Sequence, residues 1–557
     1  MTEFDRPRSA RGPGATPDSR TRGAHPPSRR RFLELTGATG LAAGLAGCAG
    51  GYQDEADEGG DANGTDDGTG PELQDSVTIA LGYEPPVTGE FWRNIYGIMP
   101  YFTNVLEPLT IPNYDLRPDP WLASDWERTG DLTWEFDLRE DVTFHNGATL
   151  DAEAVVFSIQ EFFDGFGNAR PFLQVESAEQ VRAIDDMTVE FTTIDPFADY
   201  PAHIAHNMVA VQHPDADEPE NKPIGTGPFT LAEMENGQHA TVEAFDDYWG
   251  EEAPAVEEIT FRVIPDASTR ALSLESHGID VAYNPPRAQV RSLEEASETA
   301  VHVRMRPSVG FCGINRYRSP TDDVRLRRAL NHAVDQREIV ETLLEGIGRP
   351  AHGPFSPLVH WALTDELPAY EQDFDEGRRL VEESSYAGEE LSLVLSSGET
   401  EGRAITETLH HWFGEIGVEL DVQIMEWTAY WDRWESGEAH MNLATPGTLS
   451  ASADYIMYGF FHSEGQWNHL MYNDEGTGLM NPGEEVDELI EEGRASMDED
   501  TTVENYGEVQ RIVMEEAGVV PLYYVEYLVG AYEDVGEFSP HPVMQMQRWA
   551  SMEHRDG

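Results

Sequence analysis

The residue types that most often carry chemistry in proteins are sparse or poorly spaced in this sequence. None of the motifs HExxH, CxxC, GxxxxGK[ST] and GxSxG occurs, so no metalloprotease, phosphate loop or hydrolase elbow is indicated. His203 and His206 are three residues apart and could share a helical face, but no further ligand pattern surrounds them. The sequence therefore predicts no catalytic residue, no resident metal and no cofactor.

The two cysteines, Cys48 and Cys312, cannot build a disulfide framework or a cysteine-rich metal site. Cys312 lies in the apolar stretch 309-VGFCGIN-315, which predicts a buried small hydrophobe rather than a nucleophile. Acidic residues number 104, so spacing cannot single out a general acid–base pair. A secreted hydrolase is the weaker alternative to a binding protein, and detectable peptide turnover would revive it.

Aromatic side chains gather beside glycine and proline turns in four short segments. The segments are 91-FWRNIYGIMPYF-102, Tyr248-Trp249, 427-WTAYWDRW-434 and 454-DYIMYGFF-461. Such clusters at helical spacing usually belong to a core, but near the ends of segments they could also line a cleft. Ligand sites are mostly apolar with a few placed polar groups, so these segments are candidates for a binding site.

Strand-like segments recur along the chain from residue 77 onward. Residues 77–83 and 259–265 are short β-branched runs, and 133–145 alternates apolar with polar side chains. Two further strands are expected over 418–424 and 519–528. Helical segments lie between these strands, and such alternation indicates α/β layers.

The helical segments begin at capping aspartates and carry apolar stripes. Asp151 precedes one helix, Asp266 a second that ends at Gly278, and the segment 322–350 reads as two more. Asp322 or Asp323 caps the first of that pair, and Asp335 caps the second, which ends at Gly346. Later helices are expected over 402–416, 427–437, 484–497 and 503–517.

The charge of the chain is far from balanced. Its 557 residues carry a formal net charge of −68, from 104 acidic and 36 basic residues, of which only Lys222 is a lysine. This length predicts two or three domains, and 39% hydrophobic residues are ample for globular folding. Evenly spread carboxylates need screening, and at molar salt the Debye length falls to about 3 Å. The composition predicts a halophilic host and excludes nucleic acid as a partner.

One arginine-led segment, 28-SRRRFLELTGATGLAAGLAGC-48, departs from that acidity. Its apolar part, residues 32–47, is shorter and more polar than a membrane span, which needs about 20 apolar residues. Residues 28–33 resemble the twin-arginine export motif, and 45-LAGC-48 resembles a lipobox. A signal anchor with an incidental cysteine is the alternative.

The resemblance implies that residues 1–47 are a twin-arginine signal peptide and that Cys48 becomes the lipid-modified first residue. Residues 49–75 are rich in Gly, Asp and Glu and contain no basic residue. Like charges extend such a segment. Residues 48–75 are therefore expected to form a lipid-anchored, acidic and disordered tether.

Five segments together resemble the family 5 solute-binding proteins of ABC importers, which include dipeptide-, oligopeptide- and nickel-binding lipoproteins. In chain order they are 103-TNVLEPL-109, 121–159, 222–233 with 246–280, 322–354 and 484–524. The resemblance implies a two-lobed, periplasmic-binding-protein-like α/β fold of type II, cluster C. It also implies a hinge and an extra inserted domain. The implied boundaries are 76–105, 222–307 and 527–557 for lobe I, 106–221 for the inserted domain, and 308–526 for lobe II.

The resemblance also implies a ligand site. Peptide binders of this family pair an Asp in an Ala-Asp-Tyr-like stretch with the ligand's amino terminus, which points to Asp454 in 453-ADY-455. A partly buried carboxylate in a closed cleft favours a cation, because the dielectric constant is low. A solvated loop carboxylate is the alternative. The expected aromatic lining consists of Tyr455, Trp427, Tyr430, Trp431 and Tyr101.

The resulting hypothesis is an extracytoplasmic receptor, lipid-anchored at the extracellular face of the membrane and expected to be a monomer. It captures dipeptides or oligopeptides between its lobes and delivers them to an ABC permease and its ATPase. The same fold binding a nickel chelate, a sugar or another solute is the alternative. His462 and His469 lie in the loop region that nickel-chelate binders use. A sensor or adhesion role without transport is a third interpretation.

Overall fold

The computed structural model describes most of the chain beyond residue 75, and the statements below concern these described residues. They are 76–82, 104–166, 170–206, 209–216, 222–235, 237–251, 253–296, 298–364, 366–398, 401–448, 450, 452–465, 482–533, 535, 539–550 and 552. Contacts group them into one unit, Thr69–Gly557. No helix among them is both long and apolar enough to cross a membrane.

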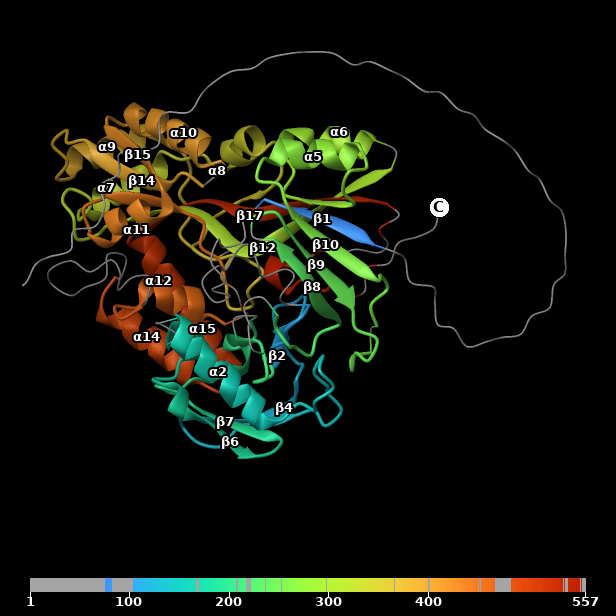
Figure 1. Ribbon diagram of the computed structural model, residues 1–557. Coiled ribbons are helices and arrows are strands. Elements are labelled where there is room, and N and C mark those ends of the chain that lie inside the picture. Colours follow the sequence, from blue (N-terminus) through green and yellow to red (C-terminus); the bar gives the residue numbers. More distant parts are fainter. Residues whose placement is uncertain are drawn as a thin grey trace, which may run out of the picture. The chain divides into compact units, whose positions relative to one another are not determined.

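An eleven-stranded mixed sheet runs through the fold (Figure 1). Its main path is β15 (Leu420–Met425), β14 (Leu391–Ser396), β16 (Met441–Ala444), β12 (Thr299–Ile314), β17 (Val519–Tyr532), β11 (Val281–Tyr283), β1 (Val77–Leu81), β10 (Glu258–Val263), β9 (His239–Ala244) and β8 (Phe229–Glu235). The short β13 (Arg349–Pro350) pairs with β17. Strand β1 is parallel to both neighbours, as is β14, and the other pairs are antiparallel.

The two long strands β12 and β17 join the two halves of this sheet. The C-terminal end of β12 pairs with β16 through residues 311–314. The C-terminal end of β17 pairs with β11 through residues 529–531. The pairing of β12 with β17 shifts register between Met305 and Val309. An irregularity of this kind bends a strand locally. The β12–β17 pair is therefore deformed in the part that links the two halves of the sheet.

Each half of the sheet has its own buried core and its own helices. One core lies on β1 and β8–β11 with α5 (Ala267–Glu275) and α6 (Val290–Glu295). The other lies on β14–β16 and is covered by α7, α9, α10 and the segment that follows α8. The helices of this half are α7 (Val324–His332), α8 (Gln336–Glu338), α9 (Phe374–Glu383) and α10 (Gly402–Glu415), with α11 (Trp427–Glu435) packed beside β14 (Figure 1).

A third core holds a smaller sheet and the C-terminal helices together. The small sheet has the order β4 (Ala123–Arg128), β5 (Thr133–Leu138), β7 (Thr188–Thr192) and β6 (Val181–Asp185), and β2 (Thr110–Pro112) pairs separately with β3 (Pro118–Pro120). The helices of this region are α2 (Ala152–Phe166), α3 (Arg170–Leu173), α4 (Tyr200–His203), α14 (Glu484–Ala495) and α15 (Glu499–Glu515). Buried residues of 109–211 and of 453–519 share one hydrophobic cluster. Residues 453–519 therefore pack against the core formed by residues 109–211. The domain boundaries expected from the sequence remain a prediction.

The capping aspartates do what the sequence predicts. Asp151 accepts a hydrogen bond from the Ala154 backbone N–H at 2.9 Å at the start of α2. Asp266, Asp323 and Asp335 likewise accept from backbone N–H groups of α5, α7 and α8. An aspartate at this position satisfies a donor that the first helical turn leaves free, so the signal is local and readable from sequence.

Two expected helices differ from the prediction. The helix after Asp335 has one α-helical turn and continues as a π-helical segment over Ile339–Leu343. Helix α15 begins at Glu499, four residues before the expected start. Residues 499–502 carry no apolar stripe, but Glu499 and Asp500 favour a helix N-terminus because acidic groups complement the helix dipole.

Candidate functional site

The residues with catalytic or metal-binding chemistry are buried in structural roles. Cys312 is fully buried, which confirms the predicted small hydrophobe, and burial raises the pKa of its thiol to about 12. The His206 Nε2 atom lies 3.2 Å from the Phe172 carbonyl oxygen, and the His203 ring packs 5.0 Å from the ring of Phe197. In the part of the chain that the structure describes, no three His, Cys, Asp or Glu side chains are grouped to hold a metal ion.

The predicted aromatic lining on α11 forms one cluster at the start of that helix. The rings of Trp427, Tyr430 and Trp431 lie 5.4 to 5.9 Å apart. Trp427 is 51% exposed, whereas Tyr430 is buried and its hydroxyl oxygen accepts a hydrogen bond from Asn442 Nδ2 at 3.0 Å. The exposed side of the cluster is therefore the indole of Trp427. Two other predicted site residues, Tyr101 and Cys48, lie outside the described residues.

Asp454 and Tyr455 begin a π-helical segment, η6 (Asp454–Tyr458), which continues into α12 (Gly459–Phe461). Both side chains are buried, at 3% and 7% exposure. The Tyr455 ring packs 5.9 Å from the ring of Phe172 in the core of 109–211. The structure thus brings the predicted residues together in two groups, one on α11 and one on η6.

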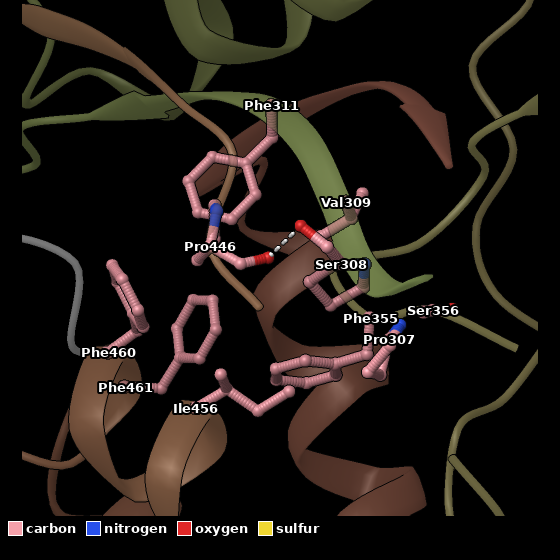
Figure 2. Close-up of a pocket in the computed structure, with 11 residues that line it drawn as sticks. Pro307, Ser308, Val309, Phe311, Phe355, Ser356, Pro446, Ile456, Phe460 and Phe461 are labelled. Atoms are coloured by element: carbon pink, nitrogen blue, oxygen red, sulfur yellow. Dashed lines mark hydrogen bonds between the residues drawn. The ribbon is translucent and has the colours of Figure 1, made fainter. Parts of the chain in front are cut away.

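An apolar pocket lies between η6, α12 and the deformed part of β12 (Figure 2). It is lined by Pro307, Ser308, Val309, Phe311, Pro354, Phe355, Ser356, Pro446, Ile456, Phe460 and Phe461. The rings of Phe311 and Phe460 meet edge to face at 6.2 Å, and those of Phe355 and Phe461 at 5.6 Å. Sequence reasoning singled out 454–461 but not the residues from β12 or from 354–356.

Contacts with residues 446–447 shape the β12 side of the pocket. Pro307 has no N–H to donate, and the register of β12 shifts at this point. The Ser308 hydroxyl donates to the Pro446 carbonyl oxygen at 2.7 Å (Figure 2). The Val309 N–H donates to the same oxygen at 3.1 Å. A Cβ atom on Gly447 would lie 2.9 Å from Ser308 Cβ, so this close approach of two chain segments requires glycine.

On the other side of η6, Asp454 meets a buried cation from the protein itself. The Arg494 Nε atom lies 2.8 Å from Asp454 Oδ1, as an ion pair without the alignment of a hydrogen bond. Gln174 Nε2 donates to Asp454 Oδ2 at 3.0 Å, and Arg494 Nη2 donates to Gln174 Oε1 at 2.8 Å. Burial raises the pKa of Asp454, and the nearby Arg494 charge opposes that rise.

Sequence reasoning missed Arg494, although a signal for it exists. It is the one basic residue in 484-EEVDELIEEGRASMDED-500. The buried residues of α14 are Val486, Ile490, Gly493 and Arg494, which follow the spacing of one helical face. A lone arginine on the apolar stripe of an acidic helix predicts a buried cation with an acidic partner.

The site can bind and enclose, but its chemistry does not suggest reaction. The Ser308 hydroxyl donates to a backbone carbonyl, so no base prepares it as a nucleophile. Four phenylalanine rings and three prolines dominate the pocket lining. Such a lining holds apolar groups and excludes water.

Comparisons with known proteins find relatives in sequence and in overall fold. The family model "Bacterial extracellular solute-binding proteins, family 5 Middle" matches residues 117–468. The chain is 25% identical over 439 residues to heme-binding protein A of Haemophilus influenzae, covering 72% of this chain and 78% of that protein. It is 26% identical over 439 residues to the dipeptide-binding protein of Escherichia coli, covering 72% and 79%. The solved structure of NikA from Staphylococcus aureus in complex with Ni(L-His)2 matches with a TM-score of 0.70 at 18% identity, covering 87% of this chain and 100% of that one. The structural match confirms the predicted two-lobed α/β fold.

Proposed function

The chain belongs to family 5 of the bacterial extracellular solute-binding proteins, and from this premise we propose that it captures dipeptides or oligopeptides for an ABC permease. Members of the family are extracytoplasmic substrate-binding proteins of ABC importers rather than enzymes. Its mechanism is therefore binding between two lobes and closure about a hinge, with ligand shifting the population toward the closed state.

The observation that carries the peptide assignment is the phenylalanine-lined pocket beside β12. In this structure it has room for about one water molecule, which is too little for a whole ligand. An apolar side chain of a longer ligand would therefore enter by widening the pocket. An extended peptide presents alternate side chains, so one apolar residue of it can enter while its backbone stays outside.

The ligands of the compared proteins leave other classes to be weighed. The E. coli relative is named for dipeptides, the H. influenzae relative for heme, and NikA holds Ni(L-His)2. The pocket residues include no histidine and no charged side chain. That lining supports an apolar peptide side chain over a metal chelate.

The same proposal includes the export route and the location of the protein. Residues 1–47 would direct twin-arginine export, Cys48 would carry the lipid, and 48–75 would hold the receptor near the outer face of the membrane of a halophilic host. Mass spectrometry of the mature amino terminus tests this directly. A protein that starts at Met1 without lipid would overturn the export and anchoring proposal.

Binding of matched peptides tests the ligand class. Isothermal titration calorimetry in molar KCl should give a lower Kd for Ala-Phe-Ala than for Ala-Ala-Ala. Phe460→Ala removes one pocket wall and should weaken Ala-Phe-Ala binding by about tenfold, since burial of an apolar side chain contributes about 1.5–3 kcal/mol. It should leave Ala-Ala-Ala unchanged. Leu272→Ala, which truncates an exposed side chain on α5, is the matched control.

Two results would refute the peptide assignment. One is the absence of binding to any peptide by the folded wild-type protein. The other is native mass spectrometry of protein purified from its host at high salt that finds a metal chelate or a sugar bound. Either result leaves the fold and the family untouched.

A further inference from the structure

A buried guanidinium fills the position beside Asp454. Arg494 is 4% exposed, although it belongs to a helix with six acidic residues among twelve. Its Nε atom faces Asp454, its Nη2 atom donates to Gln174, and its Nη1 atom lies 3.5 Å from Asp195 Oδ2. Each nitrogen of the guanidinium thus has its own polar partner from a different segment of the chain.

Aromatic rings complete the surroundings of this cation. The Arg494 guanidinium lies 4.7 Å from the centroid of the Phe197 ring and 4.9 Å from that of the Tyr458 ring. Carboxylates together with aromatic faces are the groups that recognise ammonium and guanidinium ions. The structure has therefore built a cation site at Asp454 and filled it with its own side chain.

Backbone contacts hold Arg494 in this place. The Ala198 N–H donates to the Arg494 carbonyl oxygen at 2.8 Å, which ties α14 to the segment that carries Phe197. Asp454 is 3% exposed and its two carboxylate oxygens face Arg494 and Gln174, so a ligand ammonium that took the place of the cation would have to displace the guanidinium. That would leave a buried charge without its partner, and such a loss is strongly unfavourable.

We infer that Arg494 acts as the internal counter-ion of Asp454, so that this receptor binds peptide-like solutes without recognising a free amino terminus. The inference rests on the proposed function and narrows its ligand class. Arg494 is on this view a specificity-determining residue. Ligands with acylated or otherwise uncharged amino ends are accepted as well as free peptides, and selection falls to the apolar pocket.

The first test uses the wild-type protein alone, so it does not depend on whether a variant folds. Calorimetry in molar KCl compares Ala-Phe-Ala with N-acetyl-Ala-Phe-Ala. The two Kd values should agree within threefold. A preference of tenfold or more for the free peptide would overturn the inference while upholding the peptide function. If neither peptide binds, the peptide function fails, and the second test decides whether Arg494 fills a cation site.

The second test empties the site. Arg494→Ala leaves Asp454 without its cation, and propylammonium chloride should raise the Tm of this variant above the value in equimolar NaCl. The wild-type protein and Arg379→Ala should show no such difference. Arg379 is the matched control because it pairs with Glu376 and Glu383 on the surface of α9. A Tm of Arg494→Ala that is equal in the two salts would refute the cation site.

Discussion

Glu107 offers a sharp test of how the fold is held together, because its buried carboxylate accepts four hydrogen bonds. Oε1 accepts from Trp121 Nε1 at 3.0 Å and from Tyr248 Oη at 2.8 Å. Oε2 accepts from Thr226 Oγ1 at 2.7 Å and from Trp249 Nε1 at 3.0 Å. Glu107→Gln keeps the shape of the side chain but replaces one acceptor oxygen with an amide nitrogen that only donates.

The size of the effect follows from which donors can adapt. The hydroxyl groups of Tyr248 and Thr226 can rotate and accept a hydrogen bond, but an indole N–H can only donate. Whichever way the amide points, one tryptophan loses its acceptor. A lost hydrogen bond to a charged group costs about 1.5–3 kcal/mol, and an unsatisfied buried donor adds about 1–3 kcal/mol. Burial raises the pKa of Glu107, so removing the charge recovers part of that loss. We expect a net destabilisation of about 2–3 kcal/mol.

Urea unfolding at molar salt measures this difference. Tryptophan fluorescence is a suitable probe, because Trp121 and Trp249 contact the altered group directly. The exposed Glu140→Gln is the control and should change the free energy of unfolding by less than about 0.5 kcal/mol. If Glu107→Gln is as stable as that control, the four hydrogen bonds do not hold this region together and the reasoning fails.

Three further predictions concern close packing, pH and salt. Gly225→Ala would place a Cβ atom 1.8 Å from the Val105 carbonyl oxygen and should abolish soluble folded protein. Gly414 lies in open space on α10, so Gly414→Ala should raise the free energy of unfolding by up to about 1 kcal/mol. Equal urea midpoints for the two variants would contradict this. Burial raises the pKa of the half-buried Asp199 from 3.8 to about 7. The folded protein therefore holds this proton more tightly than the unfolded chain, and the free energy of unfolding falls as pH rises from about 4 to 7. Asp199→Asn should reduce the change in the free energy of unfolding across this window by about 1–2 kcal/mol, measured from urea unfolding curves, and an unchanged slope would count against it. A net charge of −68 predicts that Tm falls steeply between molar and about 0.1 M NaCl, where the Debye length grows from about 3 to 10 Å, and a flat Tm would refute the screening argument.

Local signals in the sequence were sufficient for much of the secondary structure. Asp151, Asp266 and Asp323 cap helices because a carboxylate accepts from a backbone N–H two or three residues further on. The apolar runs at 77–83 and 259–265 become β1 and β10, which pair in parallel. Cys312 is buried because its neighbours are apolar. Each of these features depends on residues within one short segment.

Strand β12 shows where local signals are insufficient. In its first half, apolar residues alternate with His302, Arg304 and Arg306, a pattern that suits a half-buried strand but does not identify the strand that pairs with it. It becomes a strand because β17, more than 200 residues later, supplies its hydrogen-bond partners. The pocket wall at Pro307–Phe311 depends on that pairing, so it could not be predicted from its own residues.

The candidate site likewise has features that the sequence predicts and features that depend on tertiary packing. The sequence alone determined the family and the two-lobed fold, and it predicted a role for 454–461, because these depend on segment patterns in chain order. Only the tertiary structure decided that Asp454 faces Arg494, forty residues away, and that Gln174 joins them across 280 residues. A charged pair of this kind is specified by the packing of whole elements. Carboxylates are so numerous in this chain that no spacing rule could have selected the one whose partner is buried.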